Sequence, residues 1–267
     1  MIVNLIPMAG KGNRFIQERY NVAKPFVMVM NEPMIVASVK SFPPADKWVF
    51  ICRNEHLNKL KKATSGFKSA VEVVEIDRIT EGQACTCLLA EQTFGGDDVL
   101  FIASCDYQII YDEKKYQALM KDPDIDVIIW TFKIGAIKKA NPNAFAYCRT
   151  EGNRVIEVVE KRTISDNPAN DPAVVGSFTY KKARLFSQGA QQMISKNIRV
   201  NNEFYVGTSI NQLIEQGCNV VCFEVDKFIS FGNPFELDLF YYWQEYFGDL
   251  NDHSFNLLYG YKGKNQA

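Results

Sequence analysis

The chain begins with an apolar run, residues 2–6, that leads directly into the glycine-rich stretch Met8-Ala9-Gly10-Lys11-Gly12-Asn13-Arg14-Phe15. Glycines at the end of a first strand let main-chain N–H groups approach a polyphosphate closely, while Arg14 and the later Lys24 supply positive charge for its oxygens. The stretch lacks the third glycine of a dinucleotide-binding fingerprint and the Gly-Lys-Ser/Thr of a Walker loop. It predicts a strand, a phosphate-binding turn and a helix; the alternative is a tight turn whose glycines serve local geometry alone.

Short runs rich in β-branched residues alternate with helical patterns through the first half of the chain. The expected strands are 2–6, 48–52, 71–76, 99–103 and 127–132, and the expected helices lie near 34–41, 55–65, 83–94 and 112–121. Such alternation predicts βαβ units in a mostly parallel sheet, with ligand sites at the carboxyl ends of the strands. Because Asp106 follows the fourth strand, we expect it to face the same crevice as the glycine-rich stretch.

The pattern changes in the second half of the chain. We expect a hairpin of 144–149 with 154–160, strands at 174–180, 220–225 and 228–231, and helices near 181–195, 202–216 and 234–247. Aromatic residues occupy several faces of the last helix, which indicates either core packing or the subunit interface of a homo-oligomer. We expect a single domain over 1–267, with a nucleotide-binding half at 1–134, an acceptor-binding half at 135–247 and a tail at 248–267.

Net charge and the lengths of the apolar runs limit which kinds of partner this chain can bind. The net charge of −1 argues against bulk attraction to nucleic acid or to an anionic membrane, so any affinity for phosphate must be local. No apolar run approaches the roughly 20 residues that span a bilayer, and the start lacks the features of a secretory signal, so we expect a cytoplasmic protein. The two histidines, His56 and His253, lie in polar surroundings and are expected at the surface.

Taken in order, the motifs resemble those of the sugar-phosphate nucleotidyltransferases, also called nucleoside-diphosphate-sugar pyrophosphorylases. The ordered set is Met8 to Phe15, Lys24-Pro25-Phe26, Asn31-Glu32-Pro33-Met34-Ile35, Glu81-Gly82-Gln83-Ala84, Asp106, Val159-Glu160-Lys161, Val175-Gly176-Ser177-Phe178 and Phe231-Gly232-Asn233-Pro234. The resemblance implies an α/β fold of the GT-A/Rossmann-like kind, a single-domain mixed sheet flanked by helices. It also implies a reaction in which an oxygen of a phosphorylated small-molecule acceptor attacks the α-phosphorus of a nucleoside triphosphate and pyrophosphate leaves. The product would be a nucleoside-diphosphate conjugate for surface polysaccharide or related biosynthesis.

The resemblance assigns roles residue by residue. It implies catalytic roles for Arg14, Lys24 and Lys161, and nucleotide contacts from Met8, Ala9, Gly10, Lys11, Gly12, Asn13, Glu81 and Gly82, the last lying against the nucleobase. It implies acceptor contacts from Ala146, Glu160, Gly176 and Asn202. It also implies Mg²⁺ on Asp106, because carboxylate oxygens suit that ion. From the residues alone, Glu160 and Lys161 would be a solvated strand end.

Two positions, Ser230 and Ala146, depart from the family pattern, and a third, Asn202, has two possible roles. Ser230 stands where many members have a second metal-binding aspartate, so Asp226 is the expected substitute, with a surface aspartate as the alternative. Ala146 replaces a glycine of hexose-specific members, which favours a small non-sugar phosphate over a hexose 1-phosphate. Asn202 either recognises the acceptor or caps the helix that follows.

Two other functions share this fold. One is a catalytically silent nucleotide-sugar-binding regulatory subunit, since fold alone does not determine function. The other is a GT-A glycosyltransferase, against which Cys105-Asp106-Tyr107 argues because it lacks an Asp-x-Asp pair.

Overall fold

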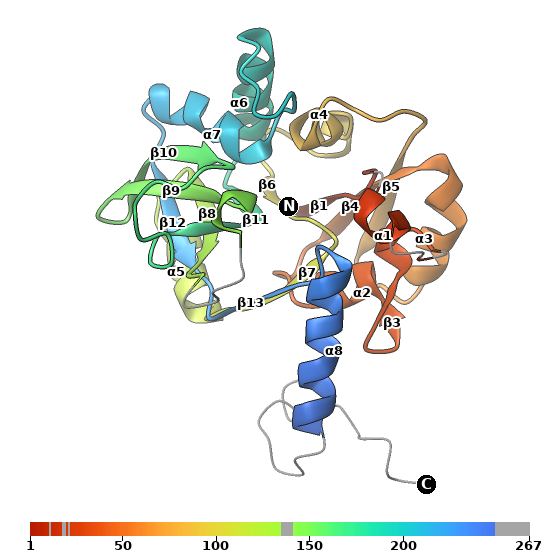
Figure 1. Cartoon of the computed structure of the whole chain (residues 1–267). Helices are drawn as coiled ribbons and strands as arrows, with labels where there is room; N and C mark the ends of the chain where they lie inside the picture. Colours follow the sequence, from red (N-terminus) through yellow and green to blue (C-terminus); the bar gives the residue numbers. More distant parts are fainter. Residues whose placement is uncertain (11, 18–19, 21, 135–140, 249–267) are drawn as a thin grey trace, which may run out of the picture.

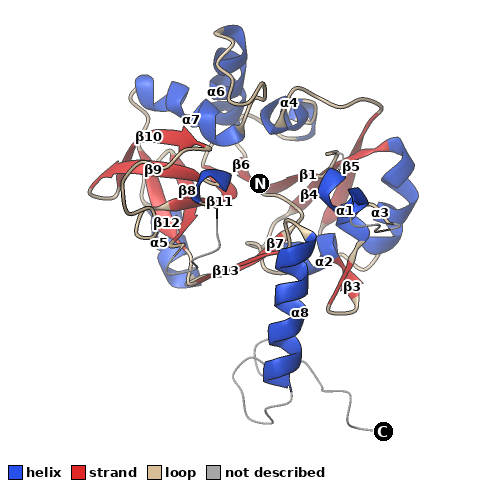
Figure 2. Cartoon of the chain, in the orientation of Figure 1, coloured by secondary structure: helices blue, strands red, loops and turns tan. Residues whose placement is uncertain are grey.

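A nine-stranded mixed sheet runs through the molecule, and helices cover both of its faces (Figures 1 and 2). The structure, a computed structural model, describes residues 1–10, 12–17, 20, 22–134 and 141–248. The strand order is β5-β4-β1-β6-β11-β8-β12-β10-β9. The predicted fold class, a mixed sheet flanked by helices, is confirmed.

The expected strands and helices occur in the predicted order, with three further short strands among them. The first half holds β1 (Ile2–Pro7), α1 (Asn13–Gln17), β2 (Met28–Val29), β3 (Glu32–Pro33), α2 (Met34–Val39), β4 (Lys47–Arg53), α3 (Leu57–Ala63), β5 (Ala70–Ile76), α4 (Gln83–Leu88), β6 (Val99–Ile102), β7 (Tyr107–Ile110), α5 (Glu113–Lys121) and β8 (Val127–Phe132). The second half holds β9 (Ala146–Glu151), β10 (Arg154–Glu160), β11 (Ala173–Tyr180), α6 (Ala183–Ser195), α7 (Val206–Glu215), β12 (Val220–Glu224), β13 (Lys227–Ser230) and α8 (Pro234–Gly248).

Strands β1, β4 and β6 are buried on both faces, which explains their continuous apolar runs, whereas the edge strand β5 is mostly exposed. On β4, Val49 and Ile51 point into one core, and Trp48 and Phe50 point into the other. The first core is closed by α4, α6 and α7, and the second by α2, α3 and α5. Strands β1, β4, β5 and β6 are parallel to one another, so their carboxyl ends meet at one edge.

Strand β11 links the two halves of the chain. It lies antiparallel between β6 and β8, so strands of both halves belong to one sheet and the sheet is less parallel than the alternation predicts. Its pairing is irregular between Val174 and Phe178, where Gly176 has φ +101°. The division into halves at 134 stays a prediction, and nearly all of the expected tail lies outside the described residues.

A separate two-stranded ladder brings distant segments together. Strand β7, which the sequence pattern does not predict, pairs antiparallel with β13 so that Tyr107 lies opposite Ser230 and Ile110 lies opposite Lys227. Beyond the ladder, the Phe231 N–H donates to the Asp106 carbonyl at 2.7 Å. Asp106 and the segment after Ser230 are therefore side by side although more than 120 residues separate them.

Helix α8 extends away from the rest of the molecule (Figure 1). Leu237 and Phe240 pack in a small core with Phe15, while Tyr242 and Trp243 are 59% and 43% exposed. Core packing therefore accounts for one face of the helix, and a subunit interface stays a prediction for the other. None of the described helices combines the length and the apolar character needed to cross a membrane.

Candidate active site

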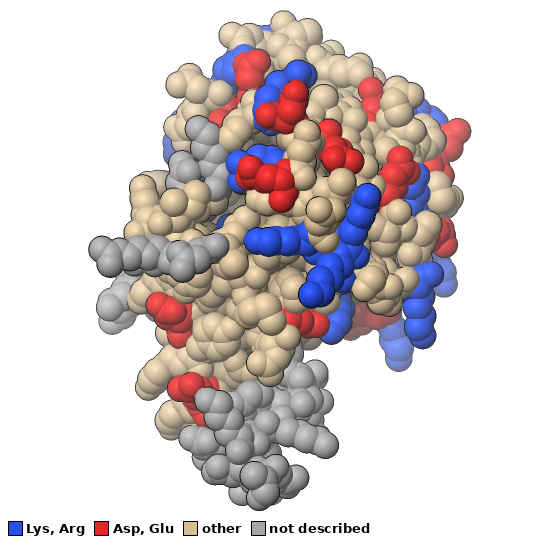
Figure 3. Space-filling model, turned by 90° about the vertical axis from the view of Figure 1, so that its right-hand side faces the viewer, with Lys and Arg blue, Asp and Glu red and all other residues tan. Residues whose placement is uncertain are grey.

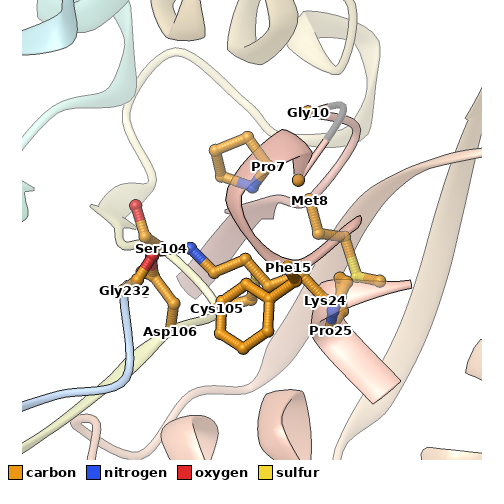
Figure 4. A pocket seen from close by; sticks show the side chains of 11 residues that line it. Pro7, Met8, Gly10, Phe15, Lys24, Pro25, Ser104, Cys105, Asp106 and Gly232 are labelled. Carbon is orange, nitrogen blue, oxygen red and sulfur yellow. Dashed lines mark hydrogen bonds and ion pairs between the residues drawn. The ribbon is translucent and has the colours of Figure 1, made fainter. Parts of the chain in front are cut away.

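A pocket of about 290 Å³ opens at the carboxyl ends of β1 and β6 (Figure 4). Its lining comes from the glycine-rich stretch, the Lys24 turn, the segment after β6 and the segment after β13: Pro7, Met8, Gly10, Gly12, Phe15, Lys24, Pro25, Ser104, Cys105, Asp106 and Gly232. The expectation that the glycine-rich stretch and Asp106 share one crevice is confirmed.

The glycine-rich stretch is positioned by its main chain. Gly12 has φ +65°, and a Cβ there would lie 3.3 Å from the Lys24 Cβ, so glycine meets both a conformational and a steric requirement. A Cβ at Gly10 would meet nothing within 4 Å, so this position leaves open space beside the pocket. The side chains of Met8 and Ala9 are buried, one in each core, and Met8 also borders the pocket. Lys11 and the side chains of Asn13 and Arg14 lie outside the described part of the structure.

The side chain of Lys24 lines the pocket and reaches toward Asp106 and Gly232. It begins the 3-10 turn Lys24–Phe26, and its Nζ lies 2.5 Å from Asp106 Oδ2 and 3.1 Å from the Gly232 carbonyl oxygen. Figure 4 shows this ammonium directed at Asp106 and Gly232. The side chains of Lys24 and Asp106 are 14% and 22% exposed, so the pair is shielded but reachable from the pocket. A cation and an anion of this kind can act on a triphosphate and on its metal ion, respectively.

The structure contradicts the assignment of Asp226 as the second metal ligand. Asp226 is exposed and precedes the far end of the β7–β13 ladder, four residues before Ser230. At roughly 3.3 Å per strand residue, it lies about 13 Å along the chain from Ser230. A different carboxylate reaches Ser230: Ser230 Oγ donates to Glu236 Oε2 at 2.7 Å. Asn233 and Glu236 form a pattern typical of a helix start, so the sequence alone does not single out Glu236.

Oxygen donors around Asp106 suit magnesium. Within the described ranges, no group of three or more His, Cys, Asp or Glu side chains surrounds one point. Magnesium does not need such a group, because it is commonly held by one or two carboxylates together with phosphate oxygens and water. Asp106 supplies one carboxylate that faces the pocket, so the residues fit this ion.

Positive charge gathers on the face that carries α1 and α3 (Figure 3). Helix α3 contributes Lys59, Lys61 and Lys62, and Lys59 lines a shallow hollow together with Lys24 and Arg53. Acidic side chains also lie on this face, consistent with the overall charge of −1. Local rather than net charge would therefore attract a phosphate.

The segment Glu81-Gly82 is fixed by main-chain contacts with Phe204. The Phe204 N–H donates to the Glu81 carbonyl at 2.8 Å, and the Ala84 N–H donates to the Phe204 carbonyl at 3.0 Å. Glu81 also forms an ion pair with Arg199. Gly82 has φ +132°, and a Cβ there would lie 2.5 Å from Phe204 N and O. A protein contact therefore explains this glycine, and its contact with a nucleobase stays a prediction.

Replacing Gly82 by Ala should destabilise the protein, because the methyl group would overlap the Phe204 main chain at a φ that L-residues avoid. We expect a loss of about 1–3 kcal/mol in the free energy of unfolding, measured by urea titration. The control is Gly66→Ala, where a Cβ meets nothing within 4 Å and φ is not positive. Equal stability of the two variants would contradict the assignment.

Glu160 and Lys161 end β10 on the acceptor side. The Glu160 side chain is only 8% exposed, so the alternative of a solvated strand end is wrong for it. Loss of water on burial raises the pKa of Glu160, and the ammonium of Lys161, 3.7 Å from Oε1, opposes that shift. Lys161 has φ +56°, and its Nζ donates to the Ala144 carbonyl at 2.5 Å. Gly207, in the first turn of α7, leaves room for Glu160: a Cβ there would lie 3.3 Å from Oε2.

Of the remaining predicted acceptor residues, Ala146 lies directly opposite Glu160 in the β9–β10 ladder. The Ala146 methyl is buried in the first core, so its placement gives no support to the idea that it crowds a sugar ring. Gly176 lies beside Tyr107: a Cβ at Gly176 would lie 3.8 Å from Cε1 of the Tyr107 ring. Asn202 is exposed in a tight turn between Val200 and Glu203, with φ +62°. The cap of α7 is Tyr205, so the prediction that Asn202 caps this helix is wrong.

The fold is shared with solved nucleotidyltransferases. A nucleoside-diphosphate-sugar pyrophosphorylase from Vibrio cholerae RC9 superposes with a TM-score of 0.72 at 22% identity, over 89% of this chain and 98% of the other. The inositol-1-phosphate CTP transferase from T. maritima gives 0.69 at 13% identity, over 92% and 97%. A UDP-glucose pyrophosphorylase complexed with UDP-glucose gives 0.68 at 16% identity, over 91% and 99%. At these identities the likeness establishes the fold, as the motif resemblance predicts. No protein-family model and no curated protein sequence matches the chain.

Proposed function

We propose that this protein is a nucleotidyltransferase that joins a nucleoside triphosphate to a phosphorylated small molecule and releases pyrophosphate. The observation that carries the proposal is the ion pair of Lys24 with Asp106 in a pocket bordered by the glycine-rich stretch. The fold supports it, because solved structures of the same fold carry the names of pyrophosphorylases and of a CTP transferase.

In this reaction the protein acts mainly by positioning and by neutralising charge. Main-chain N–H groups of the glycine-rich stretch, with Arg14, would bind the triphosphate. Lys24 would leave Asp106 to meet the charge that develops at the α-phosphate. Asp106 would hold Mg²⁺, which, when bound, supplies further charge neutralisation on the phosphates. Glu160 and Lys161 would bind the acceptor, Glu160 through a polar group and Lys161 through the phosphate.

The acceptor is proposed to be a phosphorylated small metabolite or a sugar phosphate. A nearly buried carboxylate at Glu160 favours an acceptor with a hydroxyl or ammonium group, because such a group can replace the water that burial removes. The product would enter the synthesis of surface polysaccharides or related conjugates, and the protein would work in the cytoplasm as a homo-oligomer.

The test is pyrophosphate release by the purified protein with each of the four triphosphates. Each is combined with glucose 1-phosphate, mannose 1-phosphate, phosphocholine and phosphorylated amino acids, with Mg²⁺ present. We expect release that requires both substrates and is strong for one acceptor class. Tight binding of a nucleotide sugar without any pyrophosphate release would instead identify a silent regulatory subunit. Transfer of sugar from a nucleotide sugar would identify a glycosyltransferase.

A further inference from the structure

We propose that Glu236 is the second carboxylate at the cation site of Asp106, replacing the one that Ser230 cannot supply. The inference rests on the proposed nucleotidyl transfer, since that reaction brings Mg²⁺ to Asp106. It assigns the ligand to the first turn of α8 rather than to the strand on which Ser230 lies.

Both carboxylates border one empty position beside Gly232. A Cβ on Gly232 would lie 3.0 Å from Glu236 Oε2 and 3.7 Å from Asp106 Oδ2. Gly232 is not in the left-handed region, so its backbone does not require glycine. The missing side chain instead leaves space between two anionic groups that come from different parts of the chain.

Ser230 directs Glu236 toward this space. The Ser230 hydroxyl, which donates to Glu236 Oε2 at 2.7 Å, also accepts from the Gly232 N–H at 3.2 Å. Asn233 caps α8 by accepting from the Glu236 N–H at 3.0 Å. In a capping box the glutamate side chain would turn back to the main chain of the cap residue. Here it turns to Ser230, so capping does not account for its position.

The ammonium of Lys24 already occupies a cation position in this group of oxygens. It lies between Asp106 Oδ2 and the Gly232 carbonyl oxygen, at 2.5 and 3.1 Å. A carbonyl oxygen and carboxylates are also the donors that Mg²⁺ prefers. Lys24 and a metal ion would therefore compete for Asp106 until a triphosphate draws Lys24 away.

The experiment is a Mn²⁺ titration of the nucleotide-free protein, followed by the electron paramagnetic resonance signal of the unbound ion. Glu236→Gln should weaken Mn²⁺ binding by about 10- to 100-fold. The matched control is Asp238→Asn, which removes one charge from an exposed position on the same helix and should leave binding unchanged. Equal Mn²⁺ affinity of these two variants would overturn the proposal.

Two further variants separate a ligand from a structural residue. Gly232→Ala should weaken binding as Glu236→Gln does, because the methyl group would displace the Glu236 carboxylate. Lys24→Ala should strengthen Mn²⁺ binding by about tenfold, because it removes a competing charge a few ångströms away. A Lys24→Ala affinity equal to or weaker than that of the wild type would contradict the shared cation position. Since the titration uses no substrate, it can fail while pyrophosphate release succeeds, and the reverse.

Discussion

Asp106→Asn is expected to lower the rate of pyrophosphate release by about 10³-fold at saturating substrates, with little change in fold. Losses of that order follow the removal of one charge that stabilises a phosphoryl-transfer transition state. The asparagine keeps an oxygen that can accept from Lys24 Nζ, now 2.5 Å from the carboxylate, but it cannot offer a negative charge to a metal ion. The measurement is turnover at several Mg²⁺ concentrations, together with the unfolding midpoint in urea.

The fold should survive this change for a specific reason. Asp106 is joined to Phe231 through its main-chain carbonyl, which the substitution leaves intact, and its side chain is partly exposed. Asp226→Asn is the informative comparison, since Asp226 lies at the other end of the β7–β13 ladder. We expect near-normal turnover from it. Near-normal turnover of Asp106→Asn at all Mg²⁺ concentrations would show that the metal assignment is wrong.

Local patterns were sufficient to predict the sheet and one side of the pocket. Strands such as β1 and β4 are continuous apolar runs, and parallel strands necessarily bring their carboxyl ends to one edge. That geometry predicts that Asp106 lies beside the glycine-rich stretch, as the shared pocket lining confirms. The same reasoning could not place Asp226, because its position depends on the register of β13 against β7, and β7 is too short to have a distinct pattern.

Three other residues lie differently from what their neighbours in the sequence indicate. Glu236 carries the signature of a helix start, and only the contact with Ser230 reveals that its carboxylate points elsewhere. The polar neighbours of His56 predict a surface position, and this prediction is wrong: the residue is 5% exposed and packs edge-on against Phe26. Asn202 preceded a helical pattern, but a bridge between Val200 and Glu203 makes it part of a tight turn. The burial of His56 depends on a tertiary contact with Phe26. The other two outcomes depend on local geometry, a side-chain direction and a turn type, that the residue pattern does not determine.

Lys24→Ala should slow the chemical step by roughly 10²- to 10³-fold and change the affinity for the triphosphate much less. The charge that Lys24 would meet is greatest in the transition state, so its loss should fall mainly on kcat. In the ground state the ammonium is already paired with Asp106 and the Gly232 carbonyl, so part of any attraction to the triphosphate is offset by breaking these contacts. Single-turnover kinetics and calorimetry with the triphosphate would separate the two effects.

The control for this variant is Lys62→Ala, which removes an exposed lysine of α3 from the positively charged face that carries α1 and α3. It should leave both turnover and affinity near those of the wild type. If Lys24→Ala weakened triphosphate binding by the same factor as it lowered turnover, Lys24 would be a residue that binds the triphosphate in the ground state. Equal losses of turnover in both variants would contradict a specific role for the Lys24 ammonium. They would show instead that the overall positive charge of this face accelerates the reaction.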